Sequence, residues 1–452
     1  MKKLLSNAAE RAIRYLENLN KRRIFPSPGA RERLAELEFD FPEGSTSPEE
    51  VLATLDEIGS PATVASAGGR YFGFVTGGSL PATVAAGWLA SAWDQNMYVS
   101  VMSPIGSKLE EIALRWLVDA LGLPSGTGAG FVTGATMANF TALAAARHAL
   151  LMNQGWEVGA RGLYGAPEIK VVVGDEVHVS MLKALSMLGL GRERVIRVPV
   201  DNQGRMRAEA LPELDEMSIV CLQAGNVNTG AFDPAGEVCA AAHRAGAWAH
   251  VDGAFGLWAL ADPTRAHLTA GITQADSWGA DAHKWLNAPY DSGLAFVRQP
   301  EHLRAAMSVS AAYLQQSDQR EPGHYTPELS RQARGIEVWA ALYSLGHSGL
   351  ADLVQRTCRL AVRFADGLQA MGYEILNDVV LNQVLVSFGD AERTTKMIAI
   401  LQEEGTFWAG GTVWQGQTAM RISVSSWATT EADIDRSLEA VRRVAAFDKN
   451  PS

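Results

Sequence analysis

Short, continuously apolar runs alternate with helical patterns between residues 61 and 300, and this alternation limits the possible folds more than any other feature. Strands that are apolar along their whole length and separated by helices predict a mostly parallel sheet covered on both faces. Ligands of such sheets bind at the carboxyl ends of the strands. The expected strands are FVTG (131–134), KVVVG (170–174), IVCLQAG (219–225), WAHVDG (248–253) and LAFV (294–297).

The two ends of the chain follow different patterns. Residues 1–60 predict a helical arm with too little apolar surface for a core of its own, and we expect it to pack across a dimer. Residues 321–452 predict helices laid against a small antiparallel sheet that contains QVLVSF (383–388) and MRISVS (420–425). The sequence therefore predicts an arm, a large α/β domain over residues 61–320 and a small α+β domain over 321–452.

Charge and composition exclude several classes of function. The 452 residues carry a net charge of −11, which is opposite to a nucleic-acid-binding surface and disfavours an anionic membrane. No apolar run is long enough to span a bilayer, and the N-terminus lacks the apolar core of a signal peptide, so we expect a cytoplasmic protein. The three cysteines are too far apart for a disulfide framework, and the nine histidines form no HExxH motif, so no metal site is expected.

The stretch FVTGATMANF predicts a strand that turns directly into a helix. Gly134 permits a tight turn, and the small Ala135 and Thr136 leave backbone N–H groups exposed at a helix N-terminus, where anions bind. The alternative is a plain turn with Thr136 as the helix N-cap. The stretch matches neither GxxxxGK[ST] nor GxGxxG, which disfavours nucleoside triphosphates and dinucleotides.

Two charged residues follow apolar strands. Asp252 ends WAHVD, where a carboxylate needs a buried cation unless it caps a helix or faces water. Lys284 lies in DAHKWLNAPYDSG among apolar side chains, including Trp285 and Leu286, and burial there favours a neutral, nucleophilic amine. The alternative is a lysine whose stem packs on Trp285 while its ammonium reaches water. Lys183 is a rival lysine, expected to face solvent on an amphipathic helix.

The combination of these features favours one cofactor. A phosphate cradle, a buried aspartate and a lysine that can form an imine are what pyridoxal 5′-phosphate requires. His178 follows KVVVG, where its imidazole could stack on the pyridine ring. The alternative is a histidine bonded to the backbone at the start of a helix.

The order of these motifs resembles the group II pyridoxal-phosphate-dependent amino-acid decarboxylases. The resemblance runs from about Arg70 to Thr430 and rests on GFVTGATMANFTAL, DEVHVSMLKAL, HVDGAFG and ADSWGADAHKW, with C-terminal blocks at 330–346 and 412–435. It implies the fold type I (aspartate-aminotransferase-like) architecture, a homodimer, and release of carbon dioxide from an L-amino acid by a carboxy-lyase.

The resemblance also implies a role for individual residues. Lys284 would hold the cofactor as an imine, Asp252 would pair with the ring nitrogen, and His178 would stack on the ring. The other implied cofactor contacts are Ala135, Thr136, Ser277 and His283 at the phosphate, Ala254 beneath the ring, and Asn226 where relatives often carry threonine. Asp281 is expected to orient the lysine.

A tyrosine on a mobile loop protonates Cα in such enzymes, and members that lack it tend toward aldehyde formation. The corresponding segment is YLQQSDQREPGHYTPELS (313–330), and Tyr325, beside His324, is the candidate donor. The alternative is a surface tyrosine.

Substrate choice rests on the segments at 70–82 and 94–104. Phe72, Phe74, Leu80 and Tyr98 predict an apolar pocket and favour an aromatic L-amino acid, although each also fits ordinary core packing. Glutamate, aspartate or diaminobutyrate stay open, with Arg70 as a possible partner of a substrate carboxylate. A carbon–carbon lyase or an aminotransferase also stays open, since Arg421 resembles by position the arginine that binds an α-carboxylate.

Overall fold

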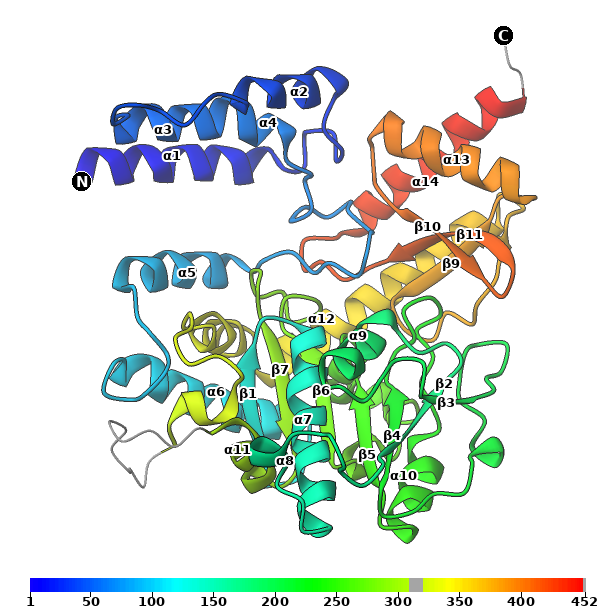
Figure 1. Cartoon of the computed structure of the whole chain (residues 1–452). Helices are drawn as coiled ribbons and strands as arrows, with labels where there is room; N and C mark the ends of the chain where they lie inside the picture. The colour runs from blue at the N-terminus through cyan, green and yellow to red at the C-terminus, as the bar shows by residue number, and fades with distance from the viewer. Residues whose placement is uncertain (309–319, 450–452) are drawn as a thin grey trace. The chain divides into compact units, whose positions relative to one another are not determined.

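The computed structural model describes residues 1–308 and 320–449 (Figure 1). Its contacts divide the chain into two units: Gly77–Arg359 with Asn377–Gln383, and Met1–Thr76 with Leu360–Leu376 and Val384–Ser452. This division differs from the three parts expected from the sequence, because the N-terminal arm groups with the C-terminal segment. None of the helices within the described ranges is long and apolar enough to cross a membrane.

The larger unit contains a seven-stranded sheet in the order β1-β7-β6-β5-β4-β2-β3. Only β7 runs against its neighbours, β1 and β6, so the predicted mostly parallel sheet is confirmed. The parallel strands place their carboxyl ends along one edge. The strands are β1 (Gly128–Val132), β2 (Lys170–Gly174), β3 (Ile196–Val198), β4 (Ser218–Gln223), β5 (Trp248–Asp252), β6 (Ser277–Asp281) and β7 (Gly293–Val297).

Helices cover this sheet, and α7 lies directly against it (Figure 1). The alanine-rich face of α7 lets its backbone approach closely: a Cβ added at Gly279 of β6 would lie 2.4 Å from Asn139 Oδ1. The apolar core lies between α7, α9, α11 and the sheet. The helices are α5 (Pro81–Trp93), α6 (Pro104–Ala120), α7 (Ala135–Asn153), α8 (Val158–Arg161), α9 (Val179–Met187), α10 (Ala235–Arg244), α11 (Pro300–Met307) and α12 (Gly335–Gln369).

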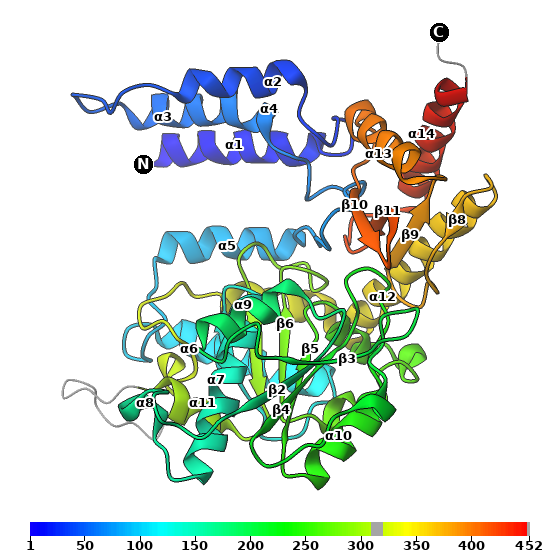
Figure 2. The same cartoon turned by 45° about the vertical axis from the view of Figure 1, so that its right-hand side comes forward.

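The C-terminal region contains a four-stranded sheet in the order β10-β11-β9-β8, beside helices α13 and α14 (Figure 2). The predicted helices-on-a-sheet arrangement is therefore present. The elements are β8 (Glu374–Ile375), β9 (Gln383–Ser387), β10 (Gly410–Trp414), β11 (Gln417–Ser423), α13 (Ala391–Glu404) and α14 (Glu431–Lys449), and the arm contributes α1 (Lys2–Asn18), α2 (Pro28–Glu32), α3 (Pro48–Thr54) and α4 (Ser60–Ala62).

Arg70 joins the arm to the C-terminal segment within the smaller unit. Its buried guanidinium donates to the carbonyl oxygens of Thr406 and Asn20 and lies 3.7 Å from the carboxylate of Asp433. Burial lowers the pKa of Arg70. The idea that Arg70 awaits a substrate carboxylate is therefore wrong, because backbone and side-chain acceptors of this chain already surround it.

Candidate active site

Five of the sequence-predicted residues follow the carboxyl ends of parallel strands. Ala135 follows β1, His178 follows β2, Asn226 follows β4, Asp252 ends β5, and Lys284 follows β6. Since these strands run in the same direction, the five residues lie along one edge of the sheet.

Lys284 forms an ion pair with an acid of its own loop. Its Nζ lies 2.8 Å from Asp281 Oδ2, and its side chain is partly buried. Trp285 and Leu286 are fully buried beside it, and Trp285 Nε1 donates to Thr357 Oγ1 at 2.9 Å. The amine is therefore held by a carboxylate as well as by an apolar wall.

The carboxylate of Asp281 also meets the N-terminus of α7. The backbone N–H of Ala135 donates to Asp281 Oδ1 at 2.5 Å, so an anionic group lies where the helix favours one. A Cβ at Gly134 would lie 3.0 Å from His283 Cε1, so glycine permits the close approach of this histidine. Gly134, not Thr136, is the N-cap of α7, which makes the plain N-cap interpretation of Thr136 wrong.

His283 is fixed from both sides of its ring. Nδ1 accepts from the backbone N–H of Ser292 at 3.1 Å, and Nε2 lies 3.4 Å from Asp281 Oδ1. Burial lowers the pKa of His283, opposed by Asp281. Tyr290 stacks on the imidazole with ring centroids 4.3 Å apart and is 65% exposed. Sequence reasoning missed Tyr290, although an aromatic residue six positions after Lys284 in one loop was a usable signal.

Asp252 is a buried carboxylate whose partners are neutral. It is 6% exposed; Oδ1 accepts from the N–H of Ala254 at 3.1 Å, and Oδ2 accepts from Asn139 Nδ2 at 3.0 Å. Among residues 1–308 and 320–449, no lysine, arginine or histidine forms an ion pair with it. A buried carboxylate normally needs a cation. This arrangement fits a cation supplied from outside the chain, such as a protonated pyridine nitrogen.

His178 and Asn226 are held by bonds within their own loops. His178 precedes α9, and its Nδ1 accepts from the N–H of Ser180 at 3.2 Å, as the helix-start alternative predicted. Asn226 is buried, and its Oδ1 accepts from the N–H groups of Asn228 and Thr229. The bond to Ser180 fixes the imidazole of His178 through Nδ1, at one edge of the ring.

Ser277 does not belong to the phosphate site. It begins β6 rather than ending a strand, so it lies four residues, or about 13 Å along an extended chain, before Asp281. Its buried hydroxyl bonds to His250 Nδ1 at 2.8 Å and accepts from Trp248 Nε1 at 2.9 Å. The predicted phosphate contact is wrong because Ser277 was expected at the end of a strand and instead begins β6.

Tyr325 is not a residue of a free loop. It lies in a short 3-10 helix (Pro322–Tyr325), packs against the core cluster and has the guanidinium of Arg320 4.4 Å from its ring centroid. Its carbonyl oxygen lies against Gly130 of β1. The prediction of a mobile Tyr325 is therefore corrected. Residues 313–319, with which the predicted loop begins, lie outside the described residues.

Of the four predicted pocket residues, Leu80 is the one placed beside the lysine loop. Its backbone N–H donates to the carbonyl of Asn287 at 2.9 Å. A Cβ added at Gly77 would lie 1.6 Å from the carbonyl oxygen of Lys284, so only glycine permits this approach. The segment from Gly77 to Leu80 therefore forms one wall of the Lys284 loop.

The other three predicted pocket residues have different surroundings. Phe72 is fully buried in the smaller unit, edge-on to Phe364, and Phe74 is exposed and stacked on Trp408. Tyr98 lies in the larger unit under the 3-10 helix that follows Arg320. Phe72 is ordinary core, so its assignment to a pocket is wrong.

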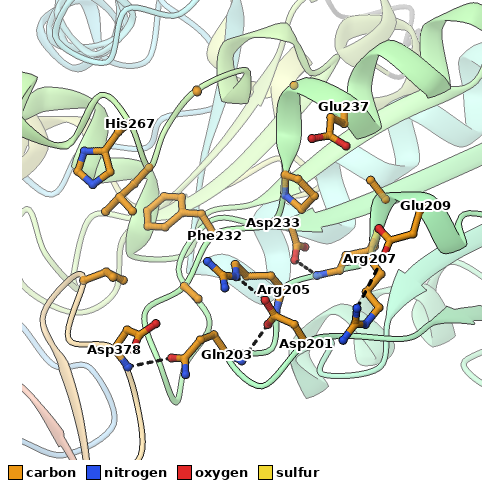
Figure 3. A pocket seen from close by; sticks show the side chains of 18 residues that line it. Asp201, Gln203, Arg205, Arg207, Glu209, Phe232, Asp233, Glu237, His267 and Asp378 are labelled. Atoms are coloured by element: carbon orange, nitrogen blue, oxygen red, sulfur yellow. Dashed lines mark hydrogen bonds and ion pairs between the residues drawn. The ribbon is translucent and has the colours of Figure 1, made fainter.

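A separate cavity of about 590 Å³ lies in the larger unit, and none of the residues around Lys284 lines it (Figure 3). Several of its charged groups are paired within the cavity wall. Arg205 pairs with Asp201 at 2.6 Å, and the Asp233 carboxylate accepts from the N–H groups of Met206 and Gln223. Burial raises the pKa of Asp233 to about 6. This cavity is therefore separate from the strand edge that carries Lys284.

Comparison with known proteins identifies a family whose conserved domain includes both Asp252 and Lys284. The family model described as "Pyridoxal-dependent decarboxylase conserved domain" matches residues 32–389. The chain belongs to this family. The aromatic-L-amino-acid decarboxylase of Bacillus atrophaeus is 26% identical over 409 residues, which cover 87% of this chain and 82% of the relative. The acidic amino acid decarboxylase of Mus musculus is 29% identical over 322 residues, which cover 68% of this chain and 58% of the relative.

Solved structures share the fold of this decarboxylase. Oryza sativa TDC with PLP and tryptamine has a TM-score of 0.89 at 21% identity and covers 99% of this chain and 98% of that chain. Mouse CSAD has a TM-score of 0.89 at 22% identity over 98% of each chain. The enzyme is a pyridoxal-phosphate-dependent amino-acid decarboxylase of fold type I. The names of its relatives include both aromatic and acidic amino acids.

Proposed function

We propose that this decarboxylase releases carbon dioxide from an aromatic L-amino acid, with pyridoxal phosphate held between Lys284 and Asp252. One observation carries the cofactor site: Asp252 is buried with neutral donors alone among the described residues, at the same sheet edge as Lys284. A protonated ring nitrogen supplies the cation that this carboxylate lacks.

The remaining contacts follow from the same edge of the sheet. Ala135 and Thr136 begin α7, and His283 lies beside Gly134, so this helix N-terminus would hold the phosphate next to Asp281. Besides Lys284 and Asp252, the residues assigned to the ring are His178 on its face, Ala254 beneath it and Asn226 near its hydroxyl group.

When bound, the cofactor accepts the electron pair released as the bond between Cα and the carboxylate breaks. The chain's own groups control protons and water. Asp281 pairs with Lys284 Nζ and orients it, and Asp252 would stabilise positive charge at the ring nitrogen. Trp285 and Leu286 exclude water from one side of the lysine.

We propose that the proton donor for Cα is one of the two tyrosines of residues 313–330, Tyr313 or Tyr325. The resemblance to the family predicts a tyrosine within residues 313–330, and Tyr325 is held under Arg320. Tyr313 is the other tyrosine of that segment, and it lies outside the described residues.

The preference for an aromatic substrate rests on the walls around the lysine. Tyr290 presents an exposed ring stacked on His283, and Leu80 contributes an apolar side chain. Arg70, which could have favoured an acidic substrate, is bonded to Thr406 and Asn20. The acidic relative makes glutamate or aspartate the second candidate class.

We also propose a cytoplasmic homodimer. Helix α5 exposes Trp88 (46%), Leu89 (54%) and Trp93 (42%), a set of large apolar side chains that a second copy would cover. Sedimentation should show a dimer, and a fully active monomer would contradict this proposal.

The experiment for substrate is a screen of single amino acids with the pyridoxal-phosphate-loaded protein, measuring carbon dioxide and amine together. We expect tryptophan, tyrosine or phenylalanine to give both products in equal amounts. Faster release from glutamate or aspartate would replace the aromatic assignment. Formation of a keto acid that requires an added 2-oxo acid would indicate an aminotransferase instead.

A further inference from the structure

Five buried side chains form a continuous hydrogen-bonded chain that ends at Asp252. Trp248 Nε1 lies 2.9 Å from Ser277 Oγ, which lies 2.8 Å from His250 Nδ1. His250 Nε2 lies 3.1 Å from Asn139 Oδ1, and Asn139 Nδ2 lies 3.0 Å from Asp252 Oδ2. All five are buried, and the chain runs from the amino edge of the sheet to its carboxyl edge.

The two ends of this chain determine the direction of every bond in it. An indole N–H can only donate, and an ionised carboxylate can only accept. Asn139 must therefore turn its NH₂ toward Asp252 and its oxygen toward His250. His250 then carries its proton on Nε2, and its Nδ1 accepts from the hydroxyl of Ser277. The Ser277 oxygen in turn accepts from Trp248.

Protonation of His250 would break this order. An imidazolium donates from both nitrogens, so Ser277 Oγ would face two donors, from His250 and Trp248, and its own proton would lose its acceptor. Complete burial also disfavours the protonated ring and lowers the pKa of His250 to about 3. The ring is therefore neutral throughout the physiological range.

We propose that Asn139 and His250 are positioning residues that orient the carboxylate of Asp252 toward the cofactor's ring nitrogen through a hydrogen-bonded chain of fixed direction. This inference rests on the proposed role of Asp252. It assigns Ser277 a function different from the phosphate contact expected from the sequence, as the donor that fixes the His250 tautomer. Because all the donors point toward Asp252, the hydrogen-bonded chain holds its carboxylate in one orientation.

The first test needs no cofactor. Imidazole ¹⁵N–¹H correlation spectra of the apoprotein, with His250 assigned by its loss in His250→Gln, should show the Nε2–H tautomer without titration between pH 5 and 8. A proton on Nδ1, or an imidazolium in this range, would overturn the proposal. Because the cofactor is absent, this result stands or falls independently of the site at Lys284.

The second test measures the dissociation constant of pyridoxal phosphate by titration of the apoprotein. We expect His250→Phe and Asn139→Leu to raise it about tenfold, the usual size for a lost hydrogen bond to a charged group. His250→Gln should restore most of the affinity, because its amide can donate to Asn139 and accept from Ser277. Equal constants for His250→Gln and His250→Phe would overturn the proposal.

Thr141→Val is the matched control. Thr141 lies on α7 with Asn139 and is fully buried, and its hydroxyl has no hydrogen-bond partner among the described residues. We expect an unchanged dissociation constant for this variant. A tenfold increase in the dissociation constant of Thr141→Val would show that any change in α7 weakens cofactor binding. This result would contradict a specific role for Asn139. If Asn139→Leu does not fold, the comparison of the two His250 variants decides.

Discussion

Glu110 and Asp252 are both buried carboxylates of the larger unit, and their partners differ. Glu110 of α6 forms two ion pairs, to Arg320 at 2.7 Å and to Arg331 at 2.8 Å. Asp252 has only the neutral donors of Asn139 and a backbone N–H among the described residues. Both carboxylates are buried, so the two acids differ in their partners and not in their burial.

The difference separates a structural acid from a functional one. Burial by itself would raise the pKa of Glu110, but the two arginines outweigh it and hold that pKa below its ordinary value. The charge of Glu110 is therefore satisfied within the chain, where it joins α6 to the segment after residue 319. Asp252 has no ion-pair partner among the described residues, and this difference supports its proposed role as a cofactor-binding acid.

Neutralising Asp252 gives the largest expected effect. We predict that Asp252→Asn lowers kcat about 10³-fold, since the charge that stabilises the ring nitrogen is lost. The thermal stability of the apoprotein should change little, because no ion pair is broken. Steady-state amine formation and the melting temperature check both parts. A strong loss of stability with near-normal kcat would show that Asp252, like Glu110, stabilises the fold and does not take part in the reaction.

Neutralising Glu110 should have the opposite profile. Glu110→Gln leaves the buried Arg331 and the partly buried Arg320 without their shared partner, and we predict a loss of about 3–5 kcal/mol in the free energy of unfolding. Urea titration of the apoprotein measures this. Glu111→Gln is the control: its exposed carboxylate pairs with Lys108, and the expected change is below about 1 kcal/mol. Equal effects at the two positions would show that the arginine pairs do not stabilise the fold.

Substitution of the two tyrosines of residues 313–330 tests which of them donates the proton to Cα. We predict that Tyr313→Phe lowers amine formation about 10²-fold, as expected for a lost general acid, and increases aldehyde formation. Tyr325→Phe should keep amine as the product at close to the original rate, because its ring packs beside Arg320. Product analysis by mass spectrometry distinguishes amine from aldehyde, and the reverse pattern would restore Tyr325 as the donor.

The smallest expected effect is on the pH dependence of stability. The pKa of Glu110 is lower in the folded chain than its ordinary value of 4.5. Its stabilisation is therefore fully present above about pH 4.5 and is lost as the pH falls through the lower, folded value. Urea titrations at a series of pH values should show a shallower acid-side decline for Glu110→Gln. An unchanged slope would assign the acid sensitivity to other groups.

The sequence was sufficient where local pattern decides the outcome. Apolar strands followed by helices predicted the sheet, and HVD and HKW placed Asp252 and Lys284 at its carboxyl edge, because parallel strands end together. The predictions failed where the outcome depends on register or on distant contacts. Ser277 was assigned to the wrong end of its strand, and nothing local shows that Tyr325 meets Arg320 or that Phe72 packs on Phe364.

The hydrogen bonds through which Asn139 and His250 orient Asp252 were missed for a similar reason. His250 precedes Asp252 by two positions, so both side chains lie on the same face of β5, and this period was a usable signal. Asn139 comes from another element, one turn after Ala135 on α7, and its contact with Asp252 depends on how closely that helix approaches the sheet.

We propose that Lys284, at the same sheet edge as Asp252, is the attachment point of pyridoxal phosphate. Borohydride reduction of the loaded protein, followed by peptide mass spectrometry, tests it directly. We predict that the added pyridoxyl phosphate mass lies on the peptide that contains Lys284, and that Lys284→Ala carries no label. Label on Lys183, which is exposed on α9, or undiminished labelling of Lys284→Ala, would contradict the account.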